Sequence, residues 1–299
     1  MRKNGKDKKG QGVGLAFFYG QMIELRDVTF SYPSPGGQPK PVFVRLNLFI
    51  PRGRYVALMG PNGSGKSTLG KLIKGLLSPS SGQVLVDGQA LKPGEIHPRV
   101  GYVFSNPENQ IVSTVVEEDV AFGLENMGMD SSMIALRVKE SLHWVEMEPY
   151  RHHSPHLLSG GQQQKVVLAG ILAMESEVLV LDEPTSMLDL KDRDEVLKLL
   201  QKIHGQGKKT VLHITHSIEE ALGAQDLLVL NRGQVSFYGS VEDFFSDDFL
   251  PESEWGKLPP FFRLIQELRS RGHAIPLRLR SVEELKNFLL QRQRVKSRL

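Results

Sequence analysis

The stretch GPNGSGKST at residues 60–68 decides the fold of this chain. Its first eight residues fit the pattern GxxxxGK[ST]. They follow a short apolar run at 55–59 and precede a segment with helical spacing, the strand, loop and helix context that the motif requires. Glycines let successive backbone N–H groups point into one concavity, and the start of a helix adds partial positive charge. The stretch is therefore expected to bind phosphate groups.

Two side chains of this loop have distinct expected roles. Lys66 is expected to reach the outer phosphates of a nucleotide, and the Ser67 hydroxyl is expected to bind Mg²⁺. The nucleotide-binding residues expected in the loop are Gly60, Pro61, Asn62, Gly63, Ser64, Gly65, Lys66, Ser67 and Thr68. Kinases, GTPases and many ATPases share such a loop, so the choice among them depends on residues further along the chain.

Apolar runs on both sides of the loop predict sheets. Runs at 178–181 and 211–214 are short, rich in Val, Ile and Leu, and flanked by helical patterns, which is typical of central strands in a parallel sheet. Nearer the N-terminus, Asp87-Gly88 interrupts the run at 83–91, and this pair favours a two-residue hairpin turn. We therefore expect an α/β fold with an antiparallel β subdomain.

The chain is expected to divide into three parts. Residues 1–21 form a basic tail, residues 22–244 the α/β domain, and residues 245–299 a small, mostly helical C-terminal extension. Within the domain, apolar residues at helical spacing predict an inserted helical subdomain at about 113–157.

Composition excludes several classes of protein. The net charge of +3 comes from the two ends, because residues 1–10 hold five basic residues and one acid, and residues 291–299 hold four basic residues and no acid. The body between them is mildly acidic, so no nucleic-acid partner is expected. The chain has no cysteine for a disulfide or a thiolate metal site. No apolar run approaches the roughly 18 residues of a membrane helix, so any membrane-spanning partner is expected to be a separate chain.

Two neighbouring acids follow one of the buried strands. Asp182 and Glu183 come directly after the apolar run at 178–181. In α/β sheets, ligands bind at the carboxyl ends of the strands. Asp182 is therefore expected in the Mg²⁺ shell, and Glu183 is expected to act on the attacking water as a general base or a polarising group.

A second anion-binding loop is predicted at LSGGQ, residues 158–162. Ser159 precedes a helical run at an N-cap position, where its hydroxyl and the free N–H groups of the helix start can bind an anion. The expected residues of this loop are Ser159, Gly160, Gly161 and Gln162.

Taken together, these motifs resemble those of the ATP-binding cassette (ABC) family. The motifs that carry the resemblance are GPNGSGKST at 60–68, LSGGQ at 158–162, LVLDEPTSMLD at 179–189 and ITHS at 214–217. The resemblance implies an ATPase that uses ATP and Mg²⁺. It also implies that His216 contacts the γ-phosphate, that Tyr32 stacks on adenine, and that Asp189 lies in the segment linking two sites.

The resemblance also implies a partner of the same kind. In this family two ATPase subunits pair head to tail, so that the phosphate loop of one subunit and the Ser159 loop of the other close on the same ATP. His216, Glu183 and Lys66 are the catalytic residues that follow from this comparison.

One branch of the family is especially similar. VFSNPENQIVSTVVEEDVAFGLEN at 103–126, GILAM at 170–174 and LPPFFRLIQELRSRG at 258–272 resemble the ATPases of energy-coupling factor transporters, which import vitamins and transition-metal ions. In such transporters, two identical or related ATPase subunits drive a membrane coupling protein and a substrate-capturing membrane protein. The chain is then expected at the cytoplasmic face of the membrane, as a peripheral subunit.

Ser105 departs from the family pattern. The family usually places a glutamine there, in the loop that touches Mg²⁺ or water. Ser105 keeps an oxygen on a shorter arm and is expected to act through a bridging water, or else Gln110 takes its place. Two alternative functions stay open: an ABC-type ATPase that is not coupled to transport, and an ATP-binding regulatory subunit with weak hydrolysis. The sequence leaves the imported substrate, and the choice between homodimer and heterodimer, open.

Overall fold

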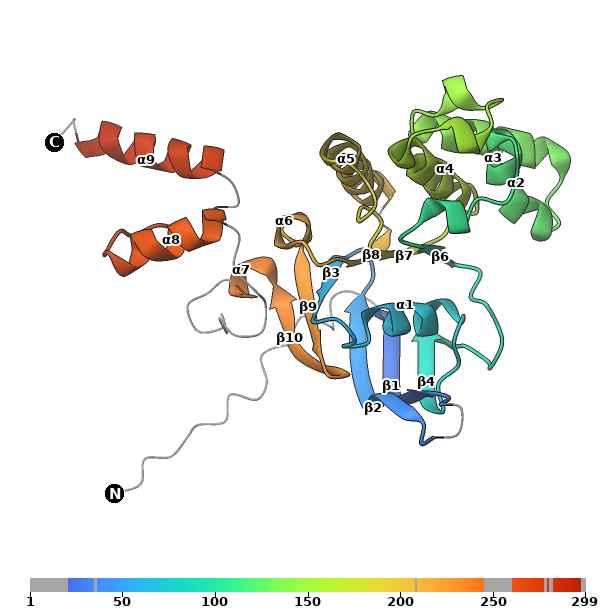
Figure 1. The fold of residues 1–299 in the computed structure, drawn as a ribbon, viewed down its shortest axis with the longest axis horizontal. Coiled ribbons are helices and arrows are strands. Elements are labelled where there is room, and N and C mark those ends of the chain that lie inside the picture. Colours follow the sequence, from blue (N-terminus) through green and yellow to red (C-terminus); the bar gives the residue numbers. More distant parts are fainter. Residues whose placement is uncertain are drawn as a thin grey trace.

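The computed structural model describes residues 21–34, 37–207, 209–244, 260–276, 279 and 282–296. The predicted basic tail lies outside these residues except for Gln21, and so does the first part of the predicted extension, residues 245–259. In the described parts the chain forms two sheets and a set of helices around them (Figure 1).

One sheet is antiparallel and has the strand order β2-β1-β4-β5. Its strands are β1 (Gln21–Tyr32), β2 (Lys40–Pro51), β4 (Ser81–Val86) and β5 (Gln89–Ala90). The hairpin between β4 and β5 turns at Asp87 and Gly88, whose φ angles are 51° and 74°. Positive φ at both central residues is the backbone of a type I′ turn, which confirms the hairpin predicted from this pair.

The second sheet has six strands in the order β10-β9-β3-β8-β7-β6. Its strands are β3 (Tyr55–Met59), β6 (Val100–Val103), β7 (Val178–Asp182), β8 (Thr210–Ile214), β9 (Asp226–Asn231) and β10 (Gln234–Ser240). All neighbours pair in parallel except β10, which is antiparallel to β9. The carboxyl ends of β3, β6, β7 and β8 therefore meet at one edge of the sheet.

The described residues form the helices α1 (Lys66–Lys74), α2 (Val116–Asn126), α3 (Ser131–Trp144), α4 (Gly160–Ala173), α5 (Leu190–Gly207), α6 (Ile218–Ala221), α7 (Val241–Phe244), α8 (Pro260–Ser270) and α9 (Val282–Lys296). Helix α1 packs on one face of the parallel sheet, and α4 and α5 pack on the other. Among the described residues, single turns of 3₁₀ helix lie at Pro107–Asn109, Glu148–Tyr150 and Pro155–Leu157. No helix of the described residues is both long enough and apolar enough to cross a membrane.

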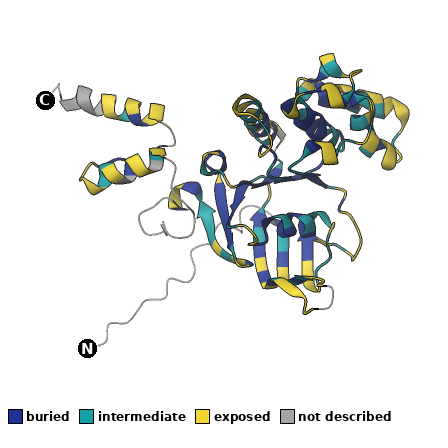
Figure 2. Ribbon diagram, in the orientation of Figure 1, coloured by how far each residue is buried: buried dark blue, intermediate teal, exposed yellow. Residues whose placement is uncertain are grey.

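Strand β3 illustrates how the core is divided. Val56 and Leu58 belong to a hydrophobic cluster that joins α1 to both sheets, whereas Tyr55, Ala57 and Met59 face a cluster built with α4 and α5. Successive side chains of a strand point to opposite faces, so a strand covered on both faces is apolar throughout. This explains why the parallel strands are buried along almost their whole length (Figure 2).

Helices α8 and α9 form a small cluster of their own. Its buried members are Ile265, Ile275, Leu279 and Leu285. Figure 1 shows this pair at the opposite end of the molecule from α2, α3 and α4. The division of the chain at residues 22, 113, 157 and 245 stays a prediction.

Candidate active site

The loop of residues 60–65 joins β3 to α1, and at Gly60, Gly63 and Gly65 its backbone has positive φ angles that glycine adopts most easily. Gly60 has φ 153°, and a Cβ there would lie 2.2 Å from the carbonyl oxygen of Leu230. Gly65, with φ 108°, is the N-cap of α1. Any larger residue at Gly60 would displace the backbone of β9, so the loop geometry depends on the predicted glycine pattern.

Lys66 is the first residue of α1 and is buried in this loop. Its Nζ donates hydrogen bonds to the carbonyl oxygens of Gly60, at 2.9 Å, and Pro61, at 3.2 Å. Burial lowers the pKa of Lys66, while the carboxylates of Glu183 and Asp182 act in the opposite direction. The ammonium group is thus held inside the phosphate loop, next to the two acids predicted to share its site.

Asp182 joins the phosphate loop to the end of β7. The Ser67 hydroxyl donates a hydrogen bond of 2.9 Å to Asp182 Oδ1, and the Tyr102 hydroxyl donates one of 2.7 Å to Asp182 Oδ2. Hydroxyl and carboxylate oxygens are ligands that Mg²⁺ prefers. The donor set of Ser67 and Asp182 therefore fits Mg²⁺. Burial, together with the Asp182 carboxylate, raises the pKa of Tyr102, so the phenol stays protonated.

The hydroxyl of Ser64 is also placed for a ligand. Ser64 is 3% exposed, and its Oγ has no hydrogen-bond partner among the described residues. A buried donor without a partner costs about 1–3 kcal/mol. A phosphate oxygen in the loop is an acceptor that removes this cost.

Glu183 follows Asp182 and has a strained backbone. Its φ is 54°, in the left-handed region, and its N–H donates to the carbonyl oxygen of Ile214 at 3.0 Å. The Oε1 atom of Glu183 lies 2.8 Å from Nε2 of His216, and both side chains remain partly exposed. Strain of this kind costs about 1–3 kcal/mol and gathers at functional sites. The structure thus brings together Lys66, Asp182, Glu183 and His216.

Tyr32 lies close to the start of α1. Its hydroxyl is 3.1 Å from Oγ1 of Thr68, and its ring packs edge-on against Phe30 with 5.0 Å between centroids. The side chain of Tyr32 is 38% exposed. A large exposed aromatic ring beside the phosphate loop is compatible with the predicted stacking on a base.

The Ser159 loop starts α4 with a capping box. Ser159 Oγ accepts from the N–H of Gln162, and the Gln162 side chain accepts from the N–H of Ser159. Ser159 Oγ also donates to Oδ2 of Asp192 at 3.0 Å, and the N–H of Gly161 donates to the same oxygen at 3.0 Å. A Cβ at Gly161 would lie 2.4 Å from Asp192 Cγ. The donors predicted to bind an anion thus bind a carboxylate of their own chain.

Two further residues predicted to bind nucleotide lie at the starts of α4 and α5. Gly160 follows Ser159 in the first turn of α4, and Asp189 Oδ1 accepts from the N–H of Asp192 at the start of α5. Among the described residues, no hydrogen bond or ion pair joins residues 158–162 to residues 60–68.

Ser105 lies half-buried in the loop after β6. The amide of Gln110 is engaged at both ends: Oε1 accepts from the N–H of Phe104 at 3.1 Å, and Nε2 donates to the carbonyl oxygen of Tyr102 at 2.9 Å. Gln110 therefore binds the backbone of its own loop, which argues against its taking the place of Ser105 at the metal. The role of Ser105 stays a prediction.

Sequence reasoning missed a buried acid beside the site. Glu220 accepts hydrogen bonds of 2.6 Å from the hydroxyls of Thr185 and Thr215, and its Oε1 lies 3.0 Å from Nε of Arg193. Burial alone would raise the pKa of Glu220, but His213, Thr185 and Thr215 outweigh it and lower the pKa to about 2. This acid ties together the segments that follow β7 and β8. In the sequence it resembles any acid in the first turn of a helix.

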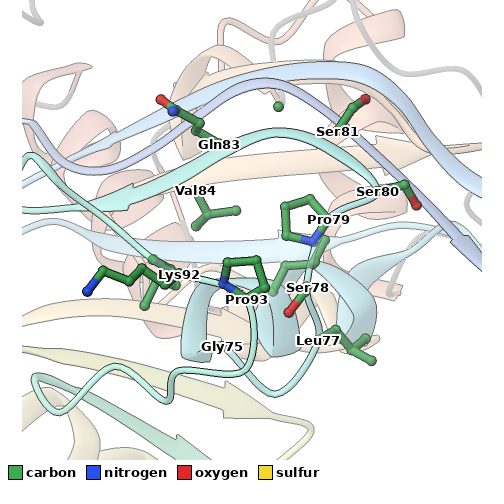
Figure 3. A pocket seen from close by; sticks show the side chains of 13 residues that line it. Gly75, Leu77, Ser78, Pro79, Ser80, Ser81, Gln83, Val84, Lys92 and Pro93 are labelled. Carbon is green, nitrogen blue, oxygen red and sulfur yellow. The ribbon is translucent and has the colours of Figure 1, made fainter.

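A cavity of about 260 Å³ lies elsewhere on the structure (Figure 3). It is lined by the C-terminal end of α1, including Leu72 and Gly75, and by Val84, Pro79 and Lys92. The phosphate loop precedes the other end of α1, so this cavity is separate from the predicted site.

The chain is similar to known proteins in both sequence and fold. The family model described as "ABC transporter" matches residues 43–186. The energy-coupling factor transporter ATP-binding protein EcfA1 of Clostridium novyi (strain NT) is 40% identical over 274 residues, which are 90% of this chain and 98% of that protein.

Two solved structures are also similar. The first is CbiO1 from Clostridium perfringens, described as part of the ABC transporter complex CbiONQ. It has a TM-score of 0.70 and 29% identity, covering 84% of this chain and 96% of that one. The ATP-binding cassette MJ0796, a dimer in a post-hydrolysis state bound to ADP and Pi, has a TM-score of 0.65 and 31% identity over 74% of this chain and 99% of its own. The chain therefore belongs to the ATP-binding proteins of energy-coupling factor transporters, a branch of the ABC transporter ATPases.

Proposed function

We propose that this chain hydrolyses ATP to energise the import of a small substrate, a vitamin or a transition-metal ion, through membrane partner proteins. The family supports this proposal, because the relative from Clostridium novyi is an energy-coupling factor transporter ATP-binding protein. The single observation that carries it is the meeting of Lys66, Asp182, Glu183 and His216 at one edge of the sheet. The chain then acts at the cytoplasmic face of the membrane, with a membrane coupling protein and a substrate-capturing membrane protein.

The phosphate loop is proposed to hold the nucleotide. The backbone of residues 60–65 and the ammonium of Lys66 bind the outer phosphates, and Thr68 lies in the first turn of α1 beside Tyr32. The ring of Tyr32 is proposed to stack on the adenine. Positive charge and N–H groups are both available here, which suits a polyanion.

The metal end of the site is proposed to consist of Ser67 and Asp182. Their oxygens would hold Mg²⁺ together with the nucleotide, and Ser105 would contribute through a water. When bound, Mg²⁺ neutralises charge on the phosphate oxygens. The chain's own part is to hold Asp182 and Ser67 side by side, 2.9 Å apart.

Hydrolysis is proposed to run through Glu183. Its carboxylate orients a water molecule and accepts or polarises its proton, while the water oxygen bonds to the γ-phosphorus. The bond from that phosphorus to the oxygen shared with the β-phosphate breaks, and the products are ADP and phosphate. His216, 2.8 Å from Glu183, is proposed to contact the γ-phosphate and to keep the carboxylate oriented.

A dimer is proposed to complete the site. The Ser159 loop has no bond to the phosphate loop of its own chain among the described residues, and the similar cassette MJ0796 is a dimer bound to ADP and Pi. Ser159, Gly160, Gly161 and Gln162 of one subunit would therefore bind the nucleotide held by the other. Asp189, at the start of α5, is proposed to lie between the two sites.

The test uses the chain purified with its co-isolating membrane proteins, which mass spectrometry identifies. Glu183→Gln is expected to lower ATP hydrolysis by about 10²- to 10⁴-fold while ATP binding persists. Glu125→Gln, an exposed residue at the end of α2, is the matched control and should hydrolyse ATP like the wild type. Equal activity of Glu183→Gln and wild type, or the absence of a multi-span membrane protein from the preparation, would overturn the proposal.

A further inference from the structure

Tyr102 places a phenol hydroxyl inside the predicted metal site. The residue lies on β6, is 4% exposed, and donates a hydrogen bond of 2.7 Å to Oδ2 of Asp182. Its backbone pairs with Val180 of β7, two residues before Asp182. The hydroxyl thus reaches along the neighbouring strand to the acid at the end of that strand.

The packing around the ring makes room for this reach. Gly70 lies in α1, opposite the ring, and a Cβ there would lie 3.2 Å from Tyr102 Cε2 and 2.8 Å from Val180 Cγ1. Both distances are too short for an ordinary carbon contact without movement of the neighbours. Glycine at position 70 therefore leaves the space that the tyrosine ring fills.

Both oxygens of the Asp182 carboxylate are engaged, each by a different hydroxyl. Oδ1 accepts from Ser67 and Oδ2 accepts from Tyr102. The two oxygens are chemically equivalent, so the two bonds together fix the orientation of the carboxylate, and a partial rotation away from it would break them. Hydrogen bonds to a carboxylate are stronger than those between neutral groups, so the bond from Tyr102 keeps the other oxygen directed at Ser67.

Tyr102 is also connected to the loop that contains Ser105. Gln110 binds the carbonyl oxygen of Tyr102 and the N–H of Phe104, and this bridges the end of β6 to the far side of the loop. Hydrogen bonds therefore run from Gln110 through Tyr102 to Asp182 and Ser67. Ser105 itself has only a one-carbon arm.

We propose that Tyr102 is a positioning residue for Asp182, and that it links the loop after β6 to the metal end of the site in place of a longer side chain at position 105. This inference rests on the proposed function of Asp182 and Ser67 as Mg²⁺ ligands. A tyrosine that only fills the core would need its ring and not its hydroxyl.

The test compares Tyr102→Phe, which removes one oxygen atom, with the wild-type full-length chain. Mn²⁺ serves as the probe for the Mg²⁺ site, and its free concentration is measured by electron paramagnetic resonance in the presence of a non-hydrolysable ATP analogue. Loss of a partner to a metal ligand is expected to weaken Mn²⁺ binding by about 10- to 100-fold. Binding of the analogue without metal should stay unchanged. Tyr150→Phe, outside the site, is the matched control and should bind Mn²⁺ like the wild type.

A second variant tests the link to the loop. Adding Ser105→Gln to Tyr102→Phe should restore at least part of the Mn²⁺ affinity, because the longer amide can replace the lost connection. No restoration would overturn the link to the loop. Unchanged Mn²⁺ affinity in Tyr102→Phe, or an equal loss of metal-free nucleotide binding, would overturn the positioning role. If Asp182→Asn also binds Mn²⁺ normally, the proposed function of Asp182 fails instead.

Discussion

Replacing Glu220 with glutamine removes a buried charge and keeps the size of the side chain. Glu220 has a side chain that is 5% exposed and receives two threonine hydroxyls and the guanidinium of Arg193. A glutamine retains one oxygen as acceptor but turns an NH₂ group toward these donors. The carboxylate is therefore matched to its surroundings in a way that the amide is not.

The magnitude follows from the pKa of Glu220. The ordinary pKa is 4.5, and in the folded protein it is lowered to about 2. This difference corresponds to about 3 kcal/mol of folding free energy at pH 7. Hydrogen bonds to a charged group, at about 1.5–3 kcal/mol each, give the same order of magnitude.

The pH dependence has a definite sign. A lowered folded pKa means that the unfolded chain takes up the proton first as the pH falls, so stability is lost below pH 4.5 and down to about pH 2. Above pH 4.5 the full contribution is present. The difference in free energy of unfolding between wild type and Glu220→Gln should thus be about 3 kcal/mol at pH 7 and shrink in acid.

The assay is urea denaturation at pH 7, 4 and 3, followed by circular dichroism. Glu219→Gln is the matched control, because Glu219 is exposed on the same helix, and surface changes of this kind stay within about 0.5 kcal/mol. A wild-type advantage over Glu220→Gln of less than about 1 kcal/mol at pH 7, or one that does not change with pH, would refute the reasoning.

Three further changes have expected outcomes. Gly70→Ala should lower the free energy of unfolding, measured in urea, by about 1–3 kcal/mol, because the added Cβ meets Val180 and Tyr102. Gly205→Ala is the control: it lies in α5 with open space around it and should raise the free energy of unfolding by about 0.4–1 kcal/mol. A change of the same sign in both variants would contradict this prediction. Lys66→Met should weaken ATP binding, measured by calorimetry, by about 10- to 100-fold. Lys71→Met, on the same helix, is the control and should bind ATP like the wild type. Equal losses of affinity in both variants would indicate that the substitutions disrupt the structure of α1 instead. Asp192→Ala should free the donors of Ser159 and Gly161. When it is added to Glu183→Gln, the subunits should therefore form a dimer in gel filtration at a lower ATP concentration than Glu183→Gln alone. An unchanged or higher ATP concentration would contradict competition by Asp192.

Much of the fold could be predicted because its signals are local. The phosphate loop, the Asp87-Gly88 turn and the apolar runs of β7 and β8 each depend on neighbouring residues, and the α/β class they predicted is confirmed. Strand β1 was harder to predict, because its 12 residues do not alternate regularly. Its pairing with β2 shifts register between Leu25 and Val28, where Asp27 has φ 47°, so the alternation that reveals a strand is broken there.

The contacts within the candidate site are of another kind. Tyr102 meets Asp182 only because β6 pairs with β7 in one particular register. Asp192 meets Ser159 only because α4 and α5 pack side by side. Spacing along the chain carries no information on either contact, so neither Tyr102 nor Asp192 could be predicted as part of the site. Lys66 could be predicted because the residues that define its motif are consecutive in the sequence.

The contact of Asp192 with the Ser159 loop has a thermodynamic consequence for pairing. Because Asp192 belongs to the same chain, its carboxylate competes for Ser159 Oγ and the Gly161 N–H at an effective concentration that dilution does not change. In the proposed dimer, a nucleotide held by a second subunit would use these donors only in the fraction of molecules whose Asp192 has moved away. The apparent affinity between the two subunits would then be the intrinsic affinity multiplied by that fraction. Asp192 would thus act as a tethered competitor that weakens pairing in the proposed dimer.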